Sequence, residues 1–193
     1  MGSYYYLMAQ LPFLIYDQKP PMSSAEFKAL AEPMMEDEDA VFFNRLSIDP
    51  ASENALSSGC DFIDNWREWE RSLRLNLAKH RAIKLKRDSS SAVEPPPYPA
   101  DAASSAARAV TGDMTPLEGE ILIDKARWNA IDAITGYEYF GRNNVYAYFL
   151  KLILLERRML FNVEKGFTEY KSLYAEIIEN SQDSGHNSPG ELK

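Results

Sequence analysis

The sequence has a single cysteine, Cys60, among its 193 residues, and only two histidines, His80 and His186. One thiol permits no intramolecular disulfide. The first residues lack the charged region and the small-residue cleavage site of a secretory signal. The Cys and His residues also lack the spacing of a metal site. We therefore expect a protein of the reducing cytoplasm with no bound metal.

Glycine is scarce as well, at nine residues, and the sequence contains neither a GxxxxGK[ST] loop nor a GxGxxG turn. Both motifs use glycine to bring backbone amides against phosphate groups. Cys60 and His80 form the only Cys/His pair that could support a nucleophile, and no third, orienting group is evident. We expect a solvated helix surface for the acidic residues Glu118, Glu120, Asp124 and Asp132. The sequence thus predicts no catalytic residue, no cofactor and no enzyme activity of its own. A metal site made only of carboxylates and a small hydrolase centred on Cys60 are the alternatives.

Long hydrophobic runs are absent. The longest, Val145 to Leu155, contains Lys151 and is followed by Glu156. It covers about half of the roughly 20 residues that a bilayer crossing needs. The run therefore predicts a buried helix, with no direct insertion in a membrane.

Positive charge is in the minority, since 21 Lys and Arg face 29 Asp and Glu, for a net charge of −8. Sequence-independent binding to nucleic acid depends on a positive surface, so we expect no nucleic-acid partner. The positive charge is nevertheless concentrated. Between Arg67 and Arg87 there are eight Lys or Arg and two Glu, a balance of +6 that leaves −14 for the rest. One basic element is expected in an acidic protein.

The composition is that of a folded globular protein, with 45% hydrophobic residues and 12% aromatics. Ser23-x-x-Glu26 and Thr115-Pro116-x-Glu118 have the form of capping boxes. Together with three- and four-residue apolar spacing, they predict an all-α protein. We expect helices from Ser24, after the acidic run 36–39, over 61–87, over 100–110 in an alanine-rich segment, over 115–135, from Asn143 or Asn144, and from Asn162 to about 180. A left-handed Gly136 should end the fifth of these helices, and residues 4–14 are expected to be a buried extended segment.

The helix over 61–87 carries the candidate partner-binding residues. Phe62, Trp66, Trp69, Leu73, Leu77 and His80 recur along one stripe. A second stripe, the arginine edge, consists of Arg67, Arg71, Arg74 and Arg81. It has three interpretations: a solvated face partly paired with Glu68 and Glu70, a docking surface for an acidic partner, or a nucleic-acid contact. Trp66 and Trp69 are interpreted as core residues, with interface anchoring as the alternative.

Serine and proline are concentrated before the second half of the chain, at Ser89 to Pro99. Proline removes backbone donors and favours extended geometry. We therefore predict two helical lobes, or one elongated bundle, arranged as an N-terminal lobe over 1–88, a flexible connector over 89–114, a three-helix unit over 115–180 and a disordered tail over 181–193.

Several segments resemble an uncharacterised bacterial family encoded beside the subunits of V/A-type ATPases. They are Tyr4-Tyr5-Tyr6-Leu7 with Leu11-Pro12, Pro21-Met22-Ser23-Ser24-x-Glu26-Phe27, the helix around Trp66 and Arg81-Ala82, Pro116-Leu117-Glu118-x-Glu120, Ala126-Arg127-Trp128, Ile131-Asp132, Tyr148-x-x-Lys151-Leu152, Glu156-Arg157 and Gly166. The match touches most of the chain from residue 4 to about 178, and its motifs are packing patterns.

The resemblance implies a role in that rotary, ion-translocating ATPase. A chain of paired long helices is similar in kind to the d-type socket protein of such ATPases, which joins the central stalk to the membrane ring. This chain is much shorter than a typical three-lobed socket protein, so a two-lobed variant and an assembly factor are both compatible with it. The expected function is a non-catalytic stalk or accessory subunit that binds other V/A-type ATPase subunits, in the cytoplasm or at the inner face of the cell membrane. A free-standing cytosolic helical adaptor is the alternative.

Overall fold

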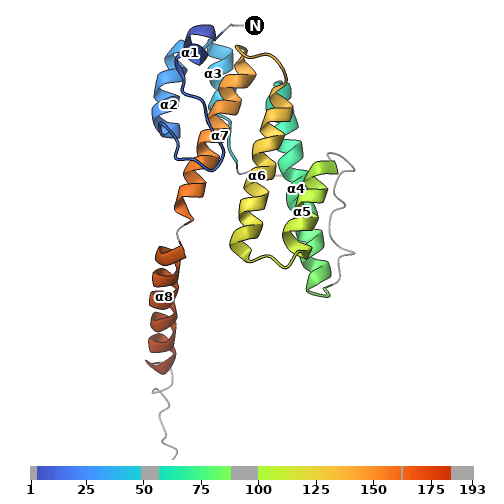
Figure 1. Cartoon of the computed structure of the whole chain (residues 1–193), viewed down its shortest axis with the longest axis vertical. Helices are drawn as coiled ribbons and strands as arrows, with labels where there is room; N and C mark the ends of the chain where they lie inside the picture. Colours follow the sequence, from blue (N-terminus) through green and yellow to red (C-terminus); the bar gives the residue numbers. More distant parts are fainter. Residues whose placement is uncertain (1–3, 49–56, 88–99, 162, 184–193) are drawn as a thin grey trace, which may run out of the picture. The chain divides into compact units, whose positions relative to one another are not determined.

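The structure, a computed structural model, describes residues 4–48, 57–87, 100–161 and 163–183. Over these residues every regular element is helical and none is a strand, which confirms the all-α prediction (Figure 1). The elements are α1 (Tyr5–Gln10), α2 (Ser24–Ala31), the 3₁₀ turn η1 (Glu32–Met34), α3 (Asp37–Phe43), α4 (Asp61–Lys84), α5 (Ala100–Thr111), α6 (Pro116–Thr135), α7 (Arg142–Leu160) and α8 (Val163–Asp183).

The chain divides into two compact units, Met1–Arg158 and Met159–Lys193. This division differs from the predicted one, which placed the boundary in a connector over 89–114 and assigned 115–180 to a single unit. Residues 100–111 of that connector form the helix α5. Residues 88–99 lie outside the described residues, as does the predicted tail beyond Asp183.

Both predicted capping boxes are present, and they set where α2 and α6 begin. Ser23 Oγ accepts from the Glu26 amide at 3.1 Å, while the Ser23 amide donates to Glu26 Oε2 at 2.7 Å. Thr115 and Glu118 repeat the arrangement, with Pro116 as the first residue of α6. Each box satisfies amides that the first turn of a helix leaves unpaired. The sequence rule was sufficient at both sites because capping is local.

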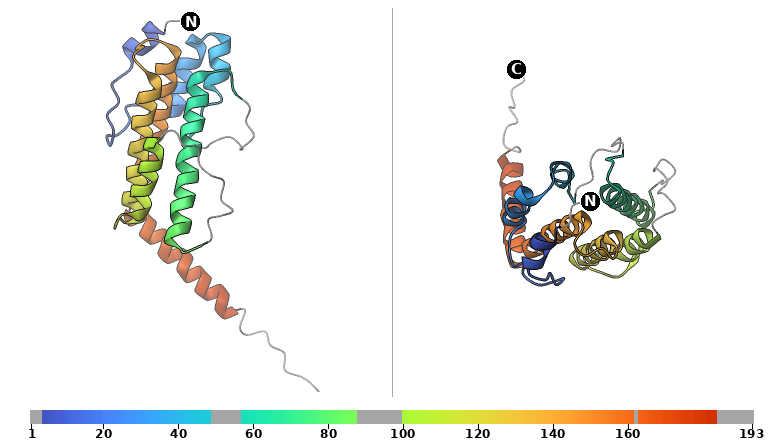
Figure 2. Two further views of the ribbon diagram at one scale, coloured as in Figure 1. Left: turned by 90° about the vertical axis from the view of Figure 1, so that its right-hand side faces the viewer. Right: turned by 90° about the horizontal axis from the view of Figure 1, so that it is seen from above.

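In the first unit, α4, α5 and α6 pack together as one group of helices (Figure 2). The buried face of α5 consists of the small residues Ala102 and Ala106 with Val110, and such a face lets two helix backbones approach closely. Lys84, at the end of α4, donates to the Val110 carbonyl at 2.8 Å. A cation placed there stabilises the carboxyl end of α5. Packing of small side chains therefore orders residues 100–111, which the sequence predicted as an alanine-rich helix and also assigned to the connector.

A second group of helices in the same unit surrounds α7, which is buried along most of its length, as its apolar sequence predicted. Phe27 from α2 lies 4.8 Å from the Tyr148 ring. Phe43 from α3 lies 4.8 Å from the Phe149 ring. Phe62 from α4 reaches Tyr146 at 5.7 Å, so these aromatic contacts join the two groups of helices into one core.

The structure corrects four predictions about the helices and their ends. Residues 5–10 form the short helix α1, because Tyr4, Leu7, Met8 and Leu11 follow helical spacing onto one side; residues 11–15 form no regular element. Helix α7 begins at Arg142, ahead of the predicted asparagine cap, and α8 continues to Asp183. Gly136 has the predicted positive φ of 74°, but its ψ of −155° lies in a region that is essentially open only to glycine and is not the left-handed helical one.

Candidate functional site

The arginine edge lies along α4, but its four residues differ in environment. Arg71 and Arg81 are exposed and form no ion pair with any residue that the structure describes. Arg67 is half-buried beside Asp64. Burial raises the pKa of Asp64, but hydrogen bonds from Ser57 and Ser58, with the charge of Arg67, outweigh it and lower that pKa. The Arg74 Nε donates to Glu70 at 2.9 Å. The free positive charge of the edge is therefore that of Arg71 and Arg81.

Trp66 and Trp69 are core residues, with 2% and 3% of their surface exposed. Their rings stack at 5.8 Å, and each indole N–H has an internal acceptor. Trp66 donates to the Ser47 carbonyl at 3.0 Å, and Trp69 donates to Asp101 at 2.9 Å. Buried indoles with satisfied N–H groups stabilise the fold and leave no surface for a partner. Trp66 and Trp69 are therefore core residues and not part of a binding surface.

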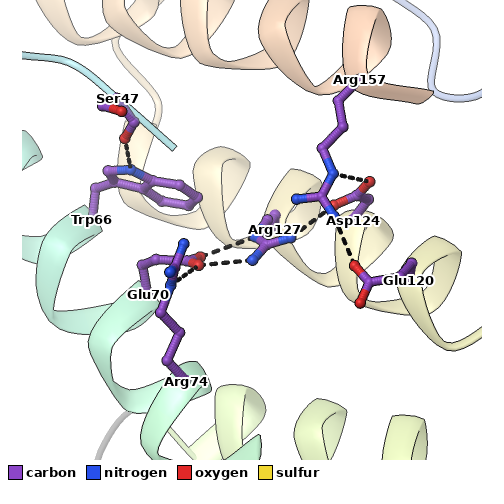
Figure 3. Close-up of polar contacts among 8 residues, drawn as sticks. All are labelled: Ser47, Trp66, Glu70, Arg74, Glu120, Asp124, Arg127 and Arg157. Carbon is purple, nitrogen blue, oxygen red and sulfur yellow. Dashed lines mark hydrogen bonds and ion pairs between the residues drawn. The ribbon is translucent and has the colours of Figure 1, made fainter. Parts of the chain in front are cut away.

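One of the three interpretations of the arginine edge placed Glu70 on a solvated face of α4, but Glu70 is fully buried and belongs to a charged network (Figure 3). Arg127 of α6 binds it with two hydrogen bonds, at 3.0 Å from Nε and 2.7 Å from Nη2. The same guanidinium donates to Asp124 Oδ1 at 2.8 Å. A bidentate arginine–carboxylate pair fixes both partners in orientation, so this contact sets how α4 lies against α6.

The network continues from Asp124 to α7. Arg157 donates to Glu120 at 2.6 Å, and its Nε lies 3.5 Å from Asp124 Oδ2. That oxygen is buried, and the 3.5 Å distance makes an ion pair without a hydrogen bond. With Arg74 included, the network contains three arginines and three carboxylates: Arg74, Arg127 and Arg157 with Glu70, Glu120 and Asp124. Its formal charge is therefore balanced.

Burial dominates the electrostatics of this network. It raises the pKa of Asp124, and the opposing charges of Arg127 and Arg157 do not fully compensate. Burial alone would lower the pKa of Arg127, but Glu70 and Asp124 outweigh it and raise that pKa. An arginine held in this way stays charged at any ordinary pH. The network therefore acts as a fixed link among α4, α6 and α7.

A sequence signal for this network existed. Glu120, Asp124 and Arg127 precede the buried Ile131 at steps of four, three and four, which places all of them along one side of α6. Asp124 was predicted to be solvated because aspartate residues are usually exposed, although its position lies on the same side of α6 as the buried Ile131. Its partner Glu70 is 57 residues away from Arg127, and no local pattern pairs residues at that separation.

A concave pocket of about 560 Å³ lies elsewhere in the first unit, between the segment after α1 and the helices α6 and α7. Its lining is mostly apolar and aromatic and includes Leu11, Phe13, Trp128 and Phe140. Lys151 contributes an ammonium group 4.7 Å from the Trp128 ring centre and paired with Asp132. The volume is within the usual range for a small-molecule site, and the lining suits an apolar group.

No family model, no curated protein and no solved structure matches this chain.

The described residues were also searched for groups of metal ligands and for membrane-spanning helices. In those ranges, no three or more His, Cys, Asp or Glu side chains gather in a group suited to a metal ion. Within the same ranges, no helix combines the length and the apolar composition that crossing a membrane requires. Cys60 is buried, with 1% of its surface exposed.

Proposed function

We propose that this chain is a non-catalytic helical subunit that acts by protein–protein contact, and that the complex it serves is a V/A-type ATPase. The observation that carries the first part is the pair of exposed arginines at the α4 edge, Arg71 and Arg81, which have no ion-pair partner among the described residues. They lie on a helix held rigidly by the buried Glu70–Arg127 pair. The second part depends on the sequence resemblance.

The rigidity of α4 is what makes the edge a docking surface. A long arginine side chain loses entropy when it pairs, so a fixed backbone beneath it lowers the remaining cost of binding. Arginine forms planar, two-point contacts with carboxylates, and this selects an acidic partner surface. Charge at the rim of an interface mainly affects the association rate and the choice of partner. In this proposal the arginine edge sets how a stalk or accessory subunit is oriented against the acidic surface of its partner.

The motifs that carry the resemblance support the same proposal. Glu120, Arg127 and Arg157 all belong to those motifs, and all three take part in the charged network. The motifs thus describe how helices are fixed to one another. Fixed helices suit a subunit that braces or transmits torque.

The test is an affinity pull-down of the tagged chain from its native membranes, with the proteins that accompany it identified. We expect subunits of the rotary ATPase. The double variant Arg71→Glu with Arg81→Glu should reduce their recovery at least about tenfold, with unchanged helix content. The matched control, Lys125→Glu with Arg108→Glu, makes the same charge change at exposed positions of α6 and α5 and should leave recovery unchanged.

The two parts of the proposal fail separately. A stable complex with other proteins, without ATPase subunits, contradicts the assignment to the ATPase. The free-standing helical adaptor is then the remaining hypothesis. If the double variant recovers ATPase subunits as well as the unmodified chain does, the arginine edge is not the docking surface, but the assignment to the ATPase is retained.

A further inference from the structure

Helix α8 presents a row of large apolar side chains to solvent, which we name the α8 stripe. Each of its members exposes between 40% and 65% of its surface. They are Phe167, Tyr170, Leu173, Tyr174, Ile177 and Ile178. Large apolar side chains that are gathered on one helix face mark an interaction surface.

The spacing of the α8 stripe is that of a coiled coil. Phe167, Tyr170, Tyr174 and Ile177 follow one another at steps of three, four and three residues, which is the a-to-d alternation of a seven-residue repeat. The helix has 21 residues, the length of three such repeats. Leu173 and Ile178 lie directly beside this seam and widen it.

A helix of this kind needs a partner to be stable. Isolated helices of such length are marginal in water, and most helical stability in proteins comes from packing of the apolar face. Gly166 lowers the intrinsic stability further, by about 1 kcal/mol relative to alanine. Within α8 the described ring contacts are local, as in the stacking of Tyr170 on Tyr174 at 6.0 Å.

We propose that α8 pairs with the α8 helix of a second copy of this chain, as a parallel two-stranded coiled coil. The seam consists of Phe167, Tyr170, Tyr174 and Ile177 from each copy. This inference is independent of the arginine edge, which belongs to the other unit of the chain.

The exposed area is sufficient for such a dimer. A large aromatic or aliphatic side chain with over half of its surface exposed offers about 100 Å², so the stripe offers on the order of 600 Å². Two stripes face to face bury about 1,200 Å², which is the lower end of the range for a specific interface. Pairing of α8 with itself therefore needs no additional surface.

Charge at the edges of the seam selects the parallel arrangement. In a parallel pair, Leu173 lies against Ile178 of the second copy, an apolar contact, and Lys171 lies against Gly166. An antiparallel pair centred on the same seam brings Lys171 against Lys171 at its middle. Like charges that face each other across a seam are unfavourable, so the parallel pair is preferred.

The first test is the mass of the full chain in solution, measured by light scattering or sedimentation. We expect the mass of two chains. Tyr174→Glu places a charge in the seam and should give the mass of one chain, whereas Ser172→Glu adds the same charge on the outer side of the helix and should leave the dimer intact. A single-chain mass for the unmodified protein, or a dimer that survives Tyr174→Glu, overturns the proposal.

The second test reports the direction of the helices. Ile177→Cys places a thiol in the seam near one end, where only a parallel pair brings the two Cβ atoms to the roughly 4 Å that a disulfide needs. Oxidation should join two chains, and Ser172→Cys, on the outer side, should join none. Cys60 is buried and does not compete. A dimer without this crosslink contradicts the parallel seam.

Discussion

At the scale of single residues, the central feature is Arg127, which binds two buried carboxylates from different places in the sequence. Only 6% of its side chain is exposed, and the Glu70 and Asp124 side chains are each 1% exposed. Such a pair adds little net stability compared with apolar residues of similar size, but removing one partner leaves an uncompensated buried charge. The network is therefore most sensitive to a single change at its centre.

We predict that Arg127→Met lowers the free energy of unfolding by about 3–5 kcal/mol, because it leaves Glu70 and Asp124 without their shared cation. Urea denaturation of the full chain measures this change. Arg74→Met is the matched control. The Arg74 side chain is 43% exposed and shares Glu70 with Arg127, so its loss should cost about 1 kcal/mol or less.

A double-mutant cycle tests whether the lost stability comes from the carboxylates that Arg127 leaves unpaired. Adding Glu70→Met to Arg127→Met removes one of the stranded carboxylates and should recover part of the lost stability. Equal losses for Arg127→Met and Arg74→Met, or no recovery in the double variant, contradict the central role of Arg127.

At the scale of elements, two helical glycines have opposite environments. A Cβ atom added at Gly166 of α8 meets nothing within 4 Å. A Cβ atom added at Gly119 of α6 lies 3.3 Å from the Ala109 carbonyl oxygen of α5, a close contact. Gly166 therefore only weakens its helix, while Gly119 permits α5 and α6 to approach.

We predict that Gly166→Ala stabilises α8 by about 0.5–1 kcal/mol, because alanine loses less backbone entropy than glycine in a helix. Amide hydrogen exchange in α8 should slow accordingly. Gly119→Ala gains the same helix propensity but should give no net stabilisation, because the α5 backbone must move. Faster exchange in α8 after Gly166→Ala contradicts a continuous helix at this position.

At the scale of the whole molecule, buried tyrosines make the stability of the fold depend on pH. Burial raises the pKa of Tyr4, Tyr16 and Tyr148 to about 12, with Asp39 adding to the effect at Tyr4. Burial also raises the pKa of Tyr146, whose hydroxyl donates to the Asp39 carbonyl at 3.0 Å. The folded chain thus keeps phenolic protons that the unfolded chain releases near pH 10.

We predict that stability is lost as the pH rises above about 10. The contribution of these tyrosines is fully present below the unfolded pKa, and it declines between pH 10 and 12 by about 1.4 kcal/mol per pH unit for each retained proton. Urea midpoints at pH 9 and pH 11 measure the loss.

Absorbance titration of tyrosinate gives an independent check. The buried Tyr4, Tyr146 and Tyr148 should ionise only above pH 10, as the chain unfolds. Ionisation of all tyrosines in a single step near pH 10, with the fold intact, contradicts the buried environment.

The sequence by itself determined the features that depend on near neighbours in the chain. The capping boxes at Ser23 and Thr115, the all-helical class and the burial of Trp66 and Trp69 each follow from residues within a few turns of one another. The arginine edge follows from the same periodicity.

Tertiary structure alone decided the features that join distant segments. The sequence placed Glu70 and Asp124 on solvated surfaces, since charged residues are usually exposed, and only the approach of α4, α6 and α7 made a buried cation available to both. The sequence predicted a helix over 100–110, but only the packing of α4 and α6 against its small residues showed that this helix belongs to the core and not to a connector. The physical reason is the same in each case: desolvation and close packing depend on which surfaces meet, and local spacing does not specify partners that lie tens of residues away.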